Sequence, residues 1–228
     1  MVFLACFLAQ FAPGETLLYE VRYGPMRLGS LELVTLARDT AQAELCHRFR
    51  AVMETNPAFA LVFEARYVTE TWCRVEDMVT LRSYKQTREK RYEAEWVADY
   101  DYGRGVVWYS TAGARFPDDR EHPLRAPARD LLTTWYYFRT LALRPPDSVS
   151  LYVHTDRREY DAKVRATRRM KMKTPAGEFR CVELVPRAAG PLAAVYLSED
   201  RGRVPVVIRT QVGGAVVSAY LRELRSPK

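Results

Sequence analysis

The 228-residue sequence lacks the short motifs that mark the common enzyme classes. It has no Gly-rich phosphate loop, no GxSxG nucleophile motif, no HExxH zinc motif and no CxxC pair. Histidine is scarce, with only His47, His122 and His154. Because such signatures are local in a sequence and would be visible here, their absence counts against a hydrolase, a nucleotide-binding protein or a zinc protein.

Long hydrophobic runs are also lacking. The N-terminal stretch MVFLACFLAQ is too short to span a bilayer, and no positively charged segment precedes it. Its terminal position and small residues favour the tail of a secretory signal whose beginning is missing. We therefore expect residues 1–12 to be a remnant of that signal and residues 13–228 to form a single exported domain. A lipid anchor at Cys6 fits less well, because Phe3 stands where such a signal prefers Leu. A buried first strand is the other alternative.

Cysteine is sparse once this leader is set aside. Cys46, Cys73 and Cys181 remain, and their odd number and wide spacing argue against a structural metal site. We expect three buried free thiols. One disulfide with a spare thiol is the alternative in an oxidising compartment.

The composition that is present suits a globular domain with a large core. Hydrophobic residues make up 48% of the chain and aromatic residues 12%. The formal charge is +7, from 35 Lys and Arg against 28 Asp and Glu, and both signs are mixed along the chain. Since a nucleic-acid-binding protein usually clusters its cations more strongly, we expect no nucleic acid partner.

Period-two alternation is the dominant pattern from Glu15 onward. The segments ETLLYEVRYG, GSLELVTLA and AQAELCHRFRAVM alternate apolar and polar residues, with an expected turn at Arg38-Asp39. Residues 59–72 also alternate, although a short helix is the alternative there. More strands follow over 78–110 and 148–224, on either side of a long loop at 112–129. We predict a mainly β (α+β) fold: a strongly curved antiparallel sheet or half-open barrel of about ten to twelve strands.

The stretch DLLTTWYYFRTLALRPPD predicts the one main helix, over about residues 130–143. Asp130 is a suitable N-cap, Trp135 and Phe138 share one side at helical spacing, and a Pro-Pro pair ends the helix. Such a helix is about 20 Å long, which is too short to cross a bilayer. It is therefore either a plug in the core or a lid over a cavity.

Three polar groups are the strongest candidates for chemistry, and each has a more ordinary interpretation. His47 alternates onto an apolar face, as a core residue does. His154 and Asp156 form an HxD pair, which would hold a metal only with a third ligand. Asp99 and Asp101 share a face, but acids before a Gly-rich turn commonly cap it. We therefore expect no catalytic residue, no metal and no cofactor.

The segment KVRATRRMKMK is the sharpest charge pattern. Alternation places five cations on one strand face: Lys163, Arg165, Arg169, Lys171 and Lys173. Same-face residues of a strand recur about every 7 Å, so these side chains would form a basic ridge. A solvated outer face is the simpler interpretation, and contact with anionic lipid headgroups or an acidic partner is the functional one.

Four segments together resemble one family. They are PGETLLYEVRYGPMRLGSLEL, DLLTTWYYFRTLALRPPDSVSLYV, TPAGEFRCVELVP and LSEDRGRVPVVIRTQVGGAVVSAYL, in that order. They are similar to the bacterial DUF3108 family of exported proteins of unassigned function, over nearly the whole chain after residue 12. The closing strands also resemble periplasmic carriers of the LolA and LolB type, which implies a half-open barrel with a helical lid over an apolar cavity. Neither resemblance brings a catalytic residue.

These patterns favour a non-catalytic protein of the periplasm or cell envelope that binds a lipid or a lipidated partner inside a curved sheet. The expected cavity residues are Tyr19, Phe49, Trp108, Trp135, Tyr136 and Phe138. The alternative is a structural or protein-interaction module of the envelope with a filled core, whose contact face is the basic ridge. An anionic membrane surface is a further candidate partner. An enzyme that uses Asp99, Asp101 or the HxD pair is the third hypothesis, and the cavity between helix and sheet discriminates among the three.

Overall fold

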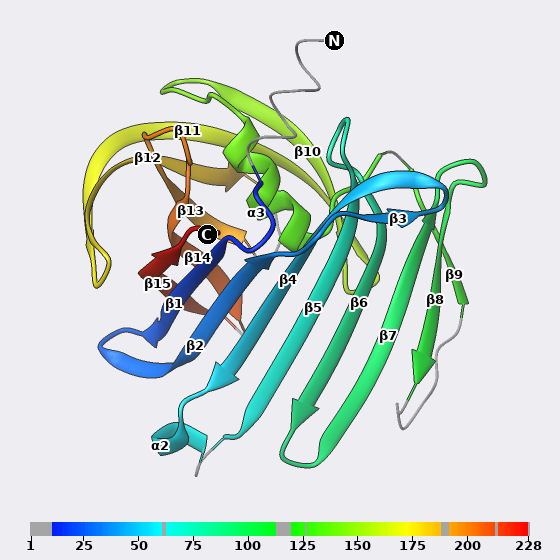
Figure 1. Cartoon of the computed structure of the whole chain (residues 1–228), viewed down its shortest axis with the longest axis horizontal. Coiled ribbons are helices and arrows are strands. Elements are labelled where there is room, and N and C mark those ends of the chain that lie inside the picture. Colours follow the sequence, from blue (N-terminus) through cyan, green and yellow to red (C-terminus); the bar gives the residue numbers. More distant parts are fainter. Residues whose placement is uncertain are drawn as a thin grey trace.

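A computed structural model describes residues 11–60, 63–112, 120–125, 127–187, 192–212 and 214–227. Within these ranges the chain forms one 15-stranded sheet and two helices (Figure 1). The first half contains β1 (Thr16–Tyr23), β2 (Met26–Thr35), β3 (Asp39–Ala41), β4 (Glu44–Thr55), α2 (Pro57–Ala60), β5 (Ala65–Arg74), β6 (Thr80–Glu89), β7 (Tyr92–Asp101), β8 (Val106–Ala112) and β9 (Arg120–Pro123). The second half contains α3 (Leu131–Thr140), β10 (Ser148–Thr155), β11 (Arg158–Thr174), β12 (Gly177–Arg187), β13 (Leu192–Ser198), β14 (Pro205–Val212) and β15 (Ala215–Arg225).

The sheet is built from two meanders, which are joined where the first described strand of the chain pairs with the last. Strands β1 to β9 and strands β10 to β15 each pair in chain order, except that β3 pairs only with β4. Every pair of neighbours is antiparallel, as short hairpin connections require. Pairing of β1 with β15 joins the two meanders and leaves β9 and β10 as the edges. The described sheet is therefore open.

Helix α3 lies on the concave side of this sheet, where it contacts β4, β5, β10 and β13 (Figure 1). Its buried aromatic side chains join apolar residues from strands of both meanders in one large core. The segment that leads into α3 is held between two strands: the Thr80 N–H donates to Ala128 O at 3.0 Å, and the His154 N–H donates to Arg129 O at 3.0 Å. These bonds fix the N-terminal end of the helix against β6 and β10.

The predicted fold class is confirmed in its main features, while the strand count was too low. The fold is mainly β, with a single large antiparallel sheet and one main helix inside its curve. The sequence patterns missed the three-residue β3 and the four-residue β9, which are too short to show alternation. For residues 59–72 they favoured a strand, with a short helix as the alternative, and a short helix, α2, begins just before this segment, where the Asn56 side chain caps the turn by accepting the Phe59 N–H at 2.7 Å. Residues 57–60 are consequently helical, and the following strand begins only at Ala65.

The turn expected at Arg38-Asp39 lies elsewhere. Asp39 begins β3, and the chain reverses at Gln42 and Ala43, whose φ angles are 52° and 63°. Both residues are therefore in the left-handed region, which glycine normally occupies. Because this hairpin contains no glycine, the residue types typical of turns did not predict its position.

Helix α3 begins as the sequence predicted and ends earlier. Asp130 is the N-cap, and its side chain accepts the Thr133 N–H. The helix stops at Thr140 because Leu141 is extended, so residues 141–143 are not helical. In the described parts of the chain, no helix has both the length and the apolar character needed to cross a membrane.

The start of the described chain bears on the expected leader. Residues 1–10, which include Cys6, lie outside the described residues. Phe11, which we counted in the leader, is 1% exposed and packs edge-on against Phe49 and Tyr136. The expected boundary at residue 12 stays a prediction.

Candidate binding cavity

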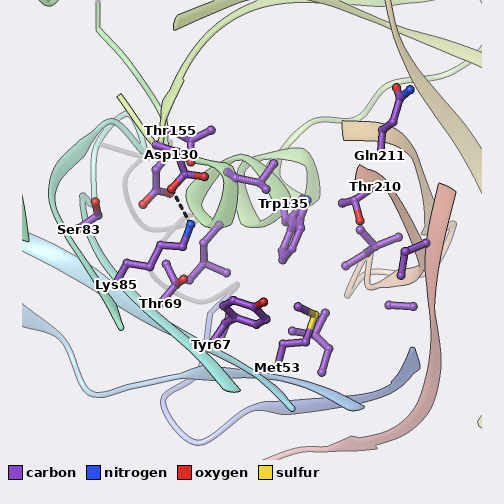
Figure 2. Close-up of a pocket in the computed structure, with 18 of the residues that line it drawn as sticks. Met53, Tyr67, Thr69, Ser83, Lys85, Asp130, Trp135, Thr155, Thr210 and Gln211 are labelled. Atoms are coloured by element: carbon purple, nitrogen blue, oxygen red, sulfur yellow. Dashed lines mark hydrogen bonds and ion pairs between the residues drawn. The ribbon is translucent and has the colours of Figure 1, made fainter. Parts of the chain in front are cut away.

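A cavity of about 450 Å³ lies between the N-terminal half of α3 and the concave face of the sheet (Figure 2). Most of it is bounded by apolar side chains: Val21, Leu31, Ala51, Met53, Leu131, Leu132, Trp135, Ile208, Val217 and Ala219. Register explains how distant segments meet here, because Ala219 is the pairing partner of both Val21 and Ile208. The short side chain of Ala219 leaves open a space that a larger residue would fill.

One end of the cavity is polar. Figure 2 shows Asp130, Thr155, Ser83, Lys85 and Thr69 gathered there, with Met53 and Trp135 further along. Thr210 and Gln211 lie at the opposite end, so polar groups border the apolar stretch on both sides, and the charged lining residues gather at the Asp130 end, which we call the polar end.

An ion pair crosses the polar end. Lys85 Nζ lies 2.5 Å from Asp156 Oδ1, so β6 is tied to the β10–β11 turn. The same ammonium lies 5.1 Å from the centre of the Trp96 ring, within the range of a cation–π contact. The Lys85 side chain is 27% exposed. Its positive charge is thus already balanced by Asp156.

Asp130 contributes a buried acceptor at the same end. The residue is 4% exposed, and its Oδ1 accepts the Thr133 N–H at 2.6 Å. Its Oδ2 is buried and has no hydrogen-bond partner within the described part of the chain. Burial raises the pKa of Asp130, against the lowering effect of the hydrogen bond from Thr133.

Trp135 presents a second unsatisfied group. Its ring lines the cavity, and its Nε1–H is buried without an acceptor among the described residues. Buried polar groups without partners are uncommon in folded proteins and often mark a place where water or a ligand binds. Two residues of the cavity wall, Asp130 and Trp135, therefore each carry a buried polar atom that lacks a partner among the described residues.

The six predicted cavity residues are distributed over three environments. Trp135 lines the cavity. Tyr19, Phe49, Tyr136 and Phe138 lie in the packed core, each no more than 1% exposed. Phe49 and Tyr136 stack with ring centres 3.6 Å apart, and the Tyr19 hydroxyl donates to Pro205 O at 2.7 Å. Trp108 is 44% exposed and does not line the cavity, because its neighbours Val107 and Tyr109 take the buried face of β8.

Helix α3 therefore acts as a lid over the cavity in its first half and as a plug in the core in its second half. Leu131, Leu132 and Trp135 in the first half of α3 cover the cavity, whereas Tyr136 and Phe138 in the second half fill the core. Sequence reasoning missed Lys85 and treated Asp130 only as a cap. The N-cap position of Asp130 could have indicated that this side chain lies near the cavity. No local sequence pattern indicated that Lys85 would face the cavity.

The five predicted cations do not lie on one face. All are exposed, but a bulge between Ala166 and Arg169 adds one residue to β11. Ala166 pairs with Leu184 and Arg169 pairs with Val182, two partners that share a face of β12. This register puts Lys163 and Arg165 on the outer face of the sheet (the outer group) and Arg169, Lys171 and Lys173 on its concave face (the concave group).

Of the concave group, Arg169 lines a second, smaller pocket at the other end of α3. This pocket has a volume of about 140 Å³ and is lined by Arg144, Arg169 and Arg203 together with Glu199 and the residues that follow the helix. Arg169 Nε lies 2.9 Å from Glu199 Oε1. The basic character is therefore split between the outer surface and this rim.

The candidate catalytic groups serve structural contacts. His47 is 1% exposed and packs against Phe11, and burial lowers its pKa to about 4. His154 is fully buried beside the Tyr100 hydroxyl, and burial likewise lowers its pKa to about 4. Asp99 pairs with Arg82 at 2.6 Å, and Asp101 Oδ1 caps the following turn by accepting the Arg104 N–H at 2.9 Å.

The three cysteines of the described chain form no disulfide. Cys46, Cys73 and Cys181 are all buried and free. Burial raises the pKa of each thiol. Thiols of this kind are unreactive at neutral pH and act as small apolar residues.

Comparison with known proteins adds a family and a fold. The family model described as "Protein of unknown function (DUF3108)" matches residues 18–221. None of the curated proteins matches the chain. A β-barrel-like protein of the domain of unknown function DUF1849 from Brucella abortus is similar in structure, with a TM-score of 0.60, 10% identity, and coverage of 95% of this chain and 98% of that chain. A candidate lipoprotein from Parabacteroides distasonis shares 10% identity over 94% and 96% of the two chains, with a TM-score of 0.40. At this identity the first structure shows the fold alone.

Proposed function

This chain belongs to the DUF3108 family, as its sequence resemblance predicted, and we propose that it is a non-catalytic protein of the cell envelope that holds the acyl chain of a lipid or of a lipid-modified partner. The observation that carries this proposal is the apolar cavity under the first half of α3. Its volume of about 450 Å³ lies within the range of small-molecule sites, roughly 300–1,000 Å³.

The energetics of an acyl chain suit this cavity. Each methylene that leaves water contributes about 0.8 kcal/mol, so even a partly inserted chain gains several kcal/mol. Met53, at 38% exposure, gives the apolar part a border with solvent through which a chain can enter. The size of the cavity favours one chain rather than a whole two-chain phospholipid.

Placement in the envelope is supported by the N-terminal sequence. MVFLACFLAQ has the apolar character and small residues of a secretory signal's end. The resemblance of the closing strands to LolA- and LolB-type carriers points to the same compartment. Export of a fusion to a periplasmic reporter, compared with the same fusion lacking residues 1–10, tests this part of the proposal.

The experiment on lipid binding is native mass spectrometry of protein purified from cells, paired with two variants. Val217 lines the cavity, and its neighbour Val216 is 46% exposed on the opposite face of β15. We expect the wild type and Val216→Trp to retain a lipid-sized mass and Val217→Trp to lose it, because the indole fills the cavity. The proposal would be excluded if the wild-type protein carried no lipid and also did not bind a fluorescent fatty acid.

A second candidate function is contact between the exposed cations of β11 and an acidic partner. The observation in its favour is that Lys163, Arg165, Lys171 and Lys173 are all exposed on a long strand. A partner that co-purifies with the wild type should be lost from Lys171→Glu with Lys173→Glu if it uses the concave group. Loss from Lys163→Glu with Arg165→Glu instead would assign the outer group, and retention in both would exclude this contact.

A further inference from the structure

We propose that the cavity selects single-chain amphiphiles whose head group donates hydrogen bonds and carries no negative charge, such as a monoacylglycerol, over free fatty acids. This inference rests on the proposed function, since it assumes that the chain occupies the apolar part of the cavity. The selection follows from three groups at the polar end: Lys85, Asp130 and Asp156.

Among the described residues that line the cavity, Lys85 is the one cation, and it is already engaged. Lys85 Nζ is 2.5 Å from Asp156 Oδ1 and also lies over the Trp96 ring. A fatty-acid carboxylate could pair with Lys85 only by displacing Asp156, which would leave Asp156 without its partner. The exchange of one carboxylate for another gives no net gain in charge pairing.

The buried acceptor favours a donor. Asp130 Oδ2 has no partner in the described chain, while the Thr133 N–H holds the other oxygen in place at 2.6 Å. The nearby Thr80 hydroxyl is engaged as well, since it accepts the Asp130 N–H and donates to Thr133 Oγ1, each at 3.0 Å. A ligand hydroxyl or amine that reaches Oδ2 satisfies a group that is otherwise desolvated and unpaired.

The charge balance disfavours an anion in either protonation state of Asp130. With Asp130 ionised, the two carboxylates and Lys85 sum to one negative charge, which repels a carboxylate head. With Asp130 protonated, the state towards which its burial shifts it, the sum is zero and Oδ2 donates instead of accepting, so a head-group hydroxyl, which can donate or accept, serves as its partner in either state. In neither state does an unpaired cation face the ligand, and a buried anion without a counter-charge is costly.

The free donor completes the match to an ester or hydroxyl head. Trp135 Nε1–H lacks an acceptor among the described residues and lines the same cavity. A monoacylglycerol offers both an ester carbonyl for this donor and hydroxyls for Asp130. An alkylamine can donate to Asp130 but offers no acceptor for the Trp135 Nε1–H.

The test compares three ligands with the same chain and different heads. Displacement of the uncharged probe N-phenyl-1-naphthylamine is measured at neutral pH with monooleoylglycerol, oleate and oleylamine, each below its aggregation concentration. We expect wild-type protein to require at least about tenfold more oleate than monooleoylglycerol for half-displacement, a difference of about 1.4 kcal/mol. Oleylamine should also displace the probe better than oleate does.

Two variants connect the preference to the residues. Asp130→Asn keeps the N-cap oxygen and the shape but can place a donor where Oδ2 was, so the preference against oleate should shrink or reverse. Asp101→Asn, a turn-capping acid outside the cavity, is the matched control and should leave the order unchanged. Lys85→Met, at a partly exposed site, leaves Asp156 unpaired and should weaken oleate further and strengthen oleylamine.

The outcomes separate this inference from the proposed function. Equal displacement by the three heads in the wild type, or oleate as the best of them, would overturn the head-group preference while chain binding stands. No displacement by any of the three would instead contradict the proposed function itself. Half-displacement ratios of oleate to monooleoylglycerol that equal the wild-type ratio in both Asp130→Asn and Lys85→Met would show that these residues do not set the preference.

Discussion

Arg139 is a fully buried guanidinium on the core side of α3. It makes a two-pronged contact with the Glu15 carboxylate, at 2.5 Å and 2.9 Å, and its Nε–H donates to Gly202 O at 3.1 Å. Its charged group also lies over the rings of Phe11 and Tyr136. This one side chain ties the helix to the start of β1 and to the loop before β14.

Removing the Arg139 side chain should destabilise the fold, because the largely buried Glu15 carboxylate then lacks its ion-pair partner. We expect Arg139→Met to lower the free energy of unfolding by about 3–5 kcal/mol, measured by urea denaturation. The double variant with Glu15→Gln should recover part of that loss, since no charge then remains unpaired. Breaking the exposed Arg88–Glu93 pair with Arg88→Met is the control and should cost less than about 1 kcal/mol. An equally small effect for Arg139→Met would contradict the account.

The two buried histidines predict a pH dependence of stability. Burial lowers the pKa of His47 and of His154 from 6.5 to about 4 in the folded protein. Between those values the unfolded chain binds more protons, so stability falls as the pH falls from about 6.5 towards 4. Each histidine can contribute up to about 3 kcal/mol of this loss.

The substitution His47→Phe measures the contribution of His47 to this loss of stability. His47 lies among Phe11 and Phe49, so phenylalanine suits its site. The free energy of unfolding of His47→Phe should decline less between neutral pH and the lower end of this window than that of the wild type. Identical slopes for the two proteins would show that His47 is not a source of the acid sensitivity.

At the scale of elements, the close approach of β2 to β4 depends on one glycine. A Cβ built on Gly29 would lie 1.9 Å from the Glu54 carbonyl oxygen, which belongs to backbone and cannot move aside. We expect Gly29→Ala to destabilise the protein by about 2–3 kcal/mol in urea denaturation. Gly103→Ala is the matched control, because its Cβ would come no closer than 3.4 Å to its nearest neighbour, the Asp101 side chain. Similar losses in both variants would argue against the clash as the cause.

Elements with regular periodicity were predictable, and irregularities within them were not. The segment KVRATRRMKMK, which alternation predicted to be a strand, lies within β11. The bulge after Ala166 had no sequence signature, and one extra residue was enough to reverse the face of every later cation. The exposure of Trp108 has a related cause, since GVVWYST carries aromatic residues on both faces of the strand.

At the scale of the whole molecule, long-range pairing decides where the cavity lies. Hairpin neighbours could be predicted from the order of strands, but the pairing of β1 with β15 joins the two ends of the chain and has no local signal. That pairing brings Val21, Ala219 and Ile208 side by side in the cavity wall. The sequence patterns could therefore predict a curved sheet with a helix inside it, but not which aromatic residues fill the core and which face open space.

The most direct test of the central claim is to locate a bound acyl chain with a brominated lipid, since bromine quenches indole fluorescence only at short range. Two single-tryptophan proteins are compared. Replacing Trp72, Trp96 and Trp108 by Phe leaves Trp135 in the cavity wall, and replacing Trp72, Trp96 and Trp135 leaves Trp108 on the outer surface. If the cavity holds the chain, the brominated lipid quenches Trp135 strongly at saturation and leaves Trp108 unchanged. Quenching of Trp108 alone, or of both to the same extent, would contradict a binding site beneath α3.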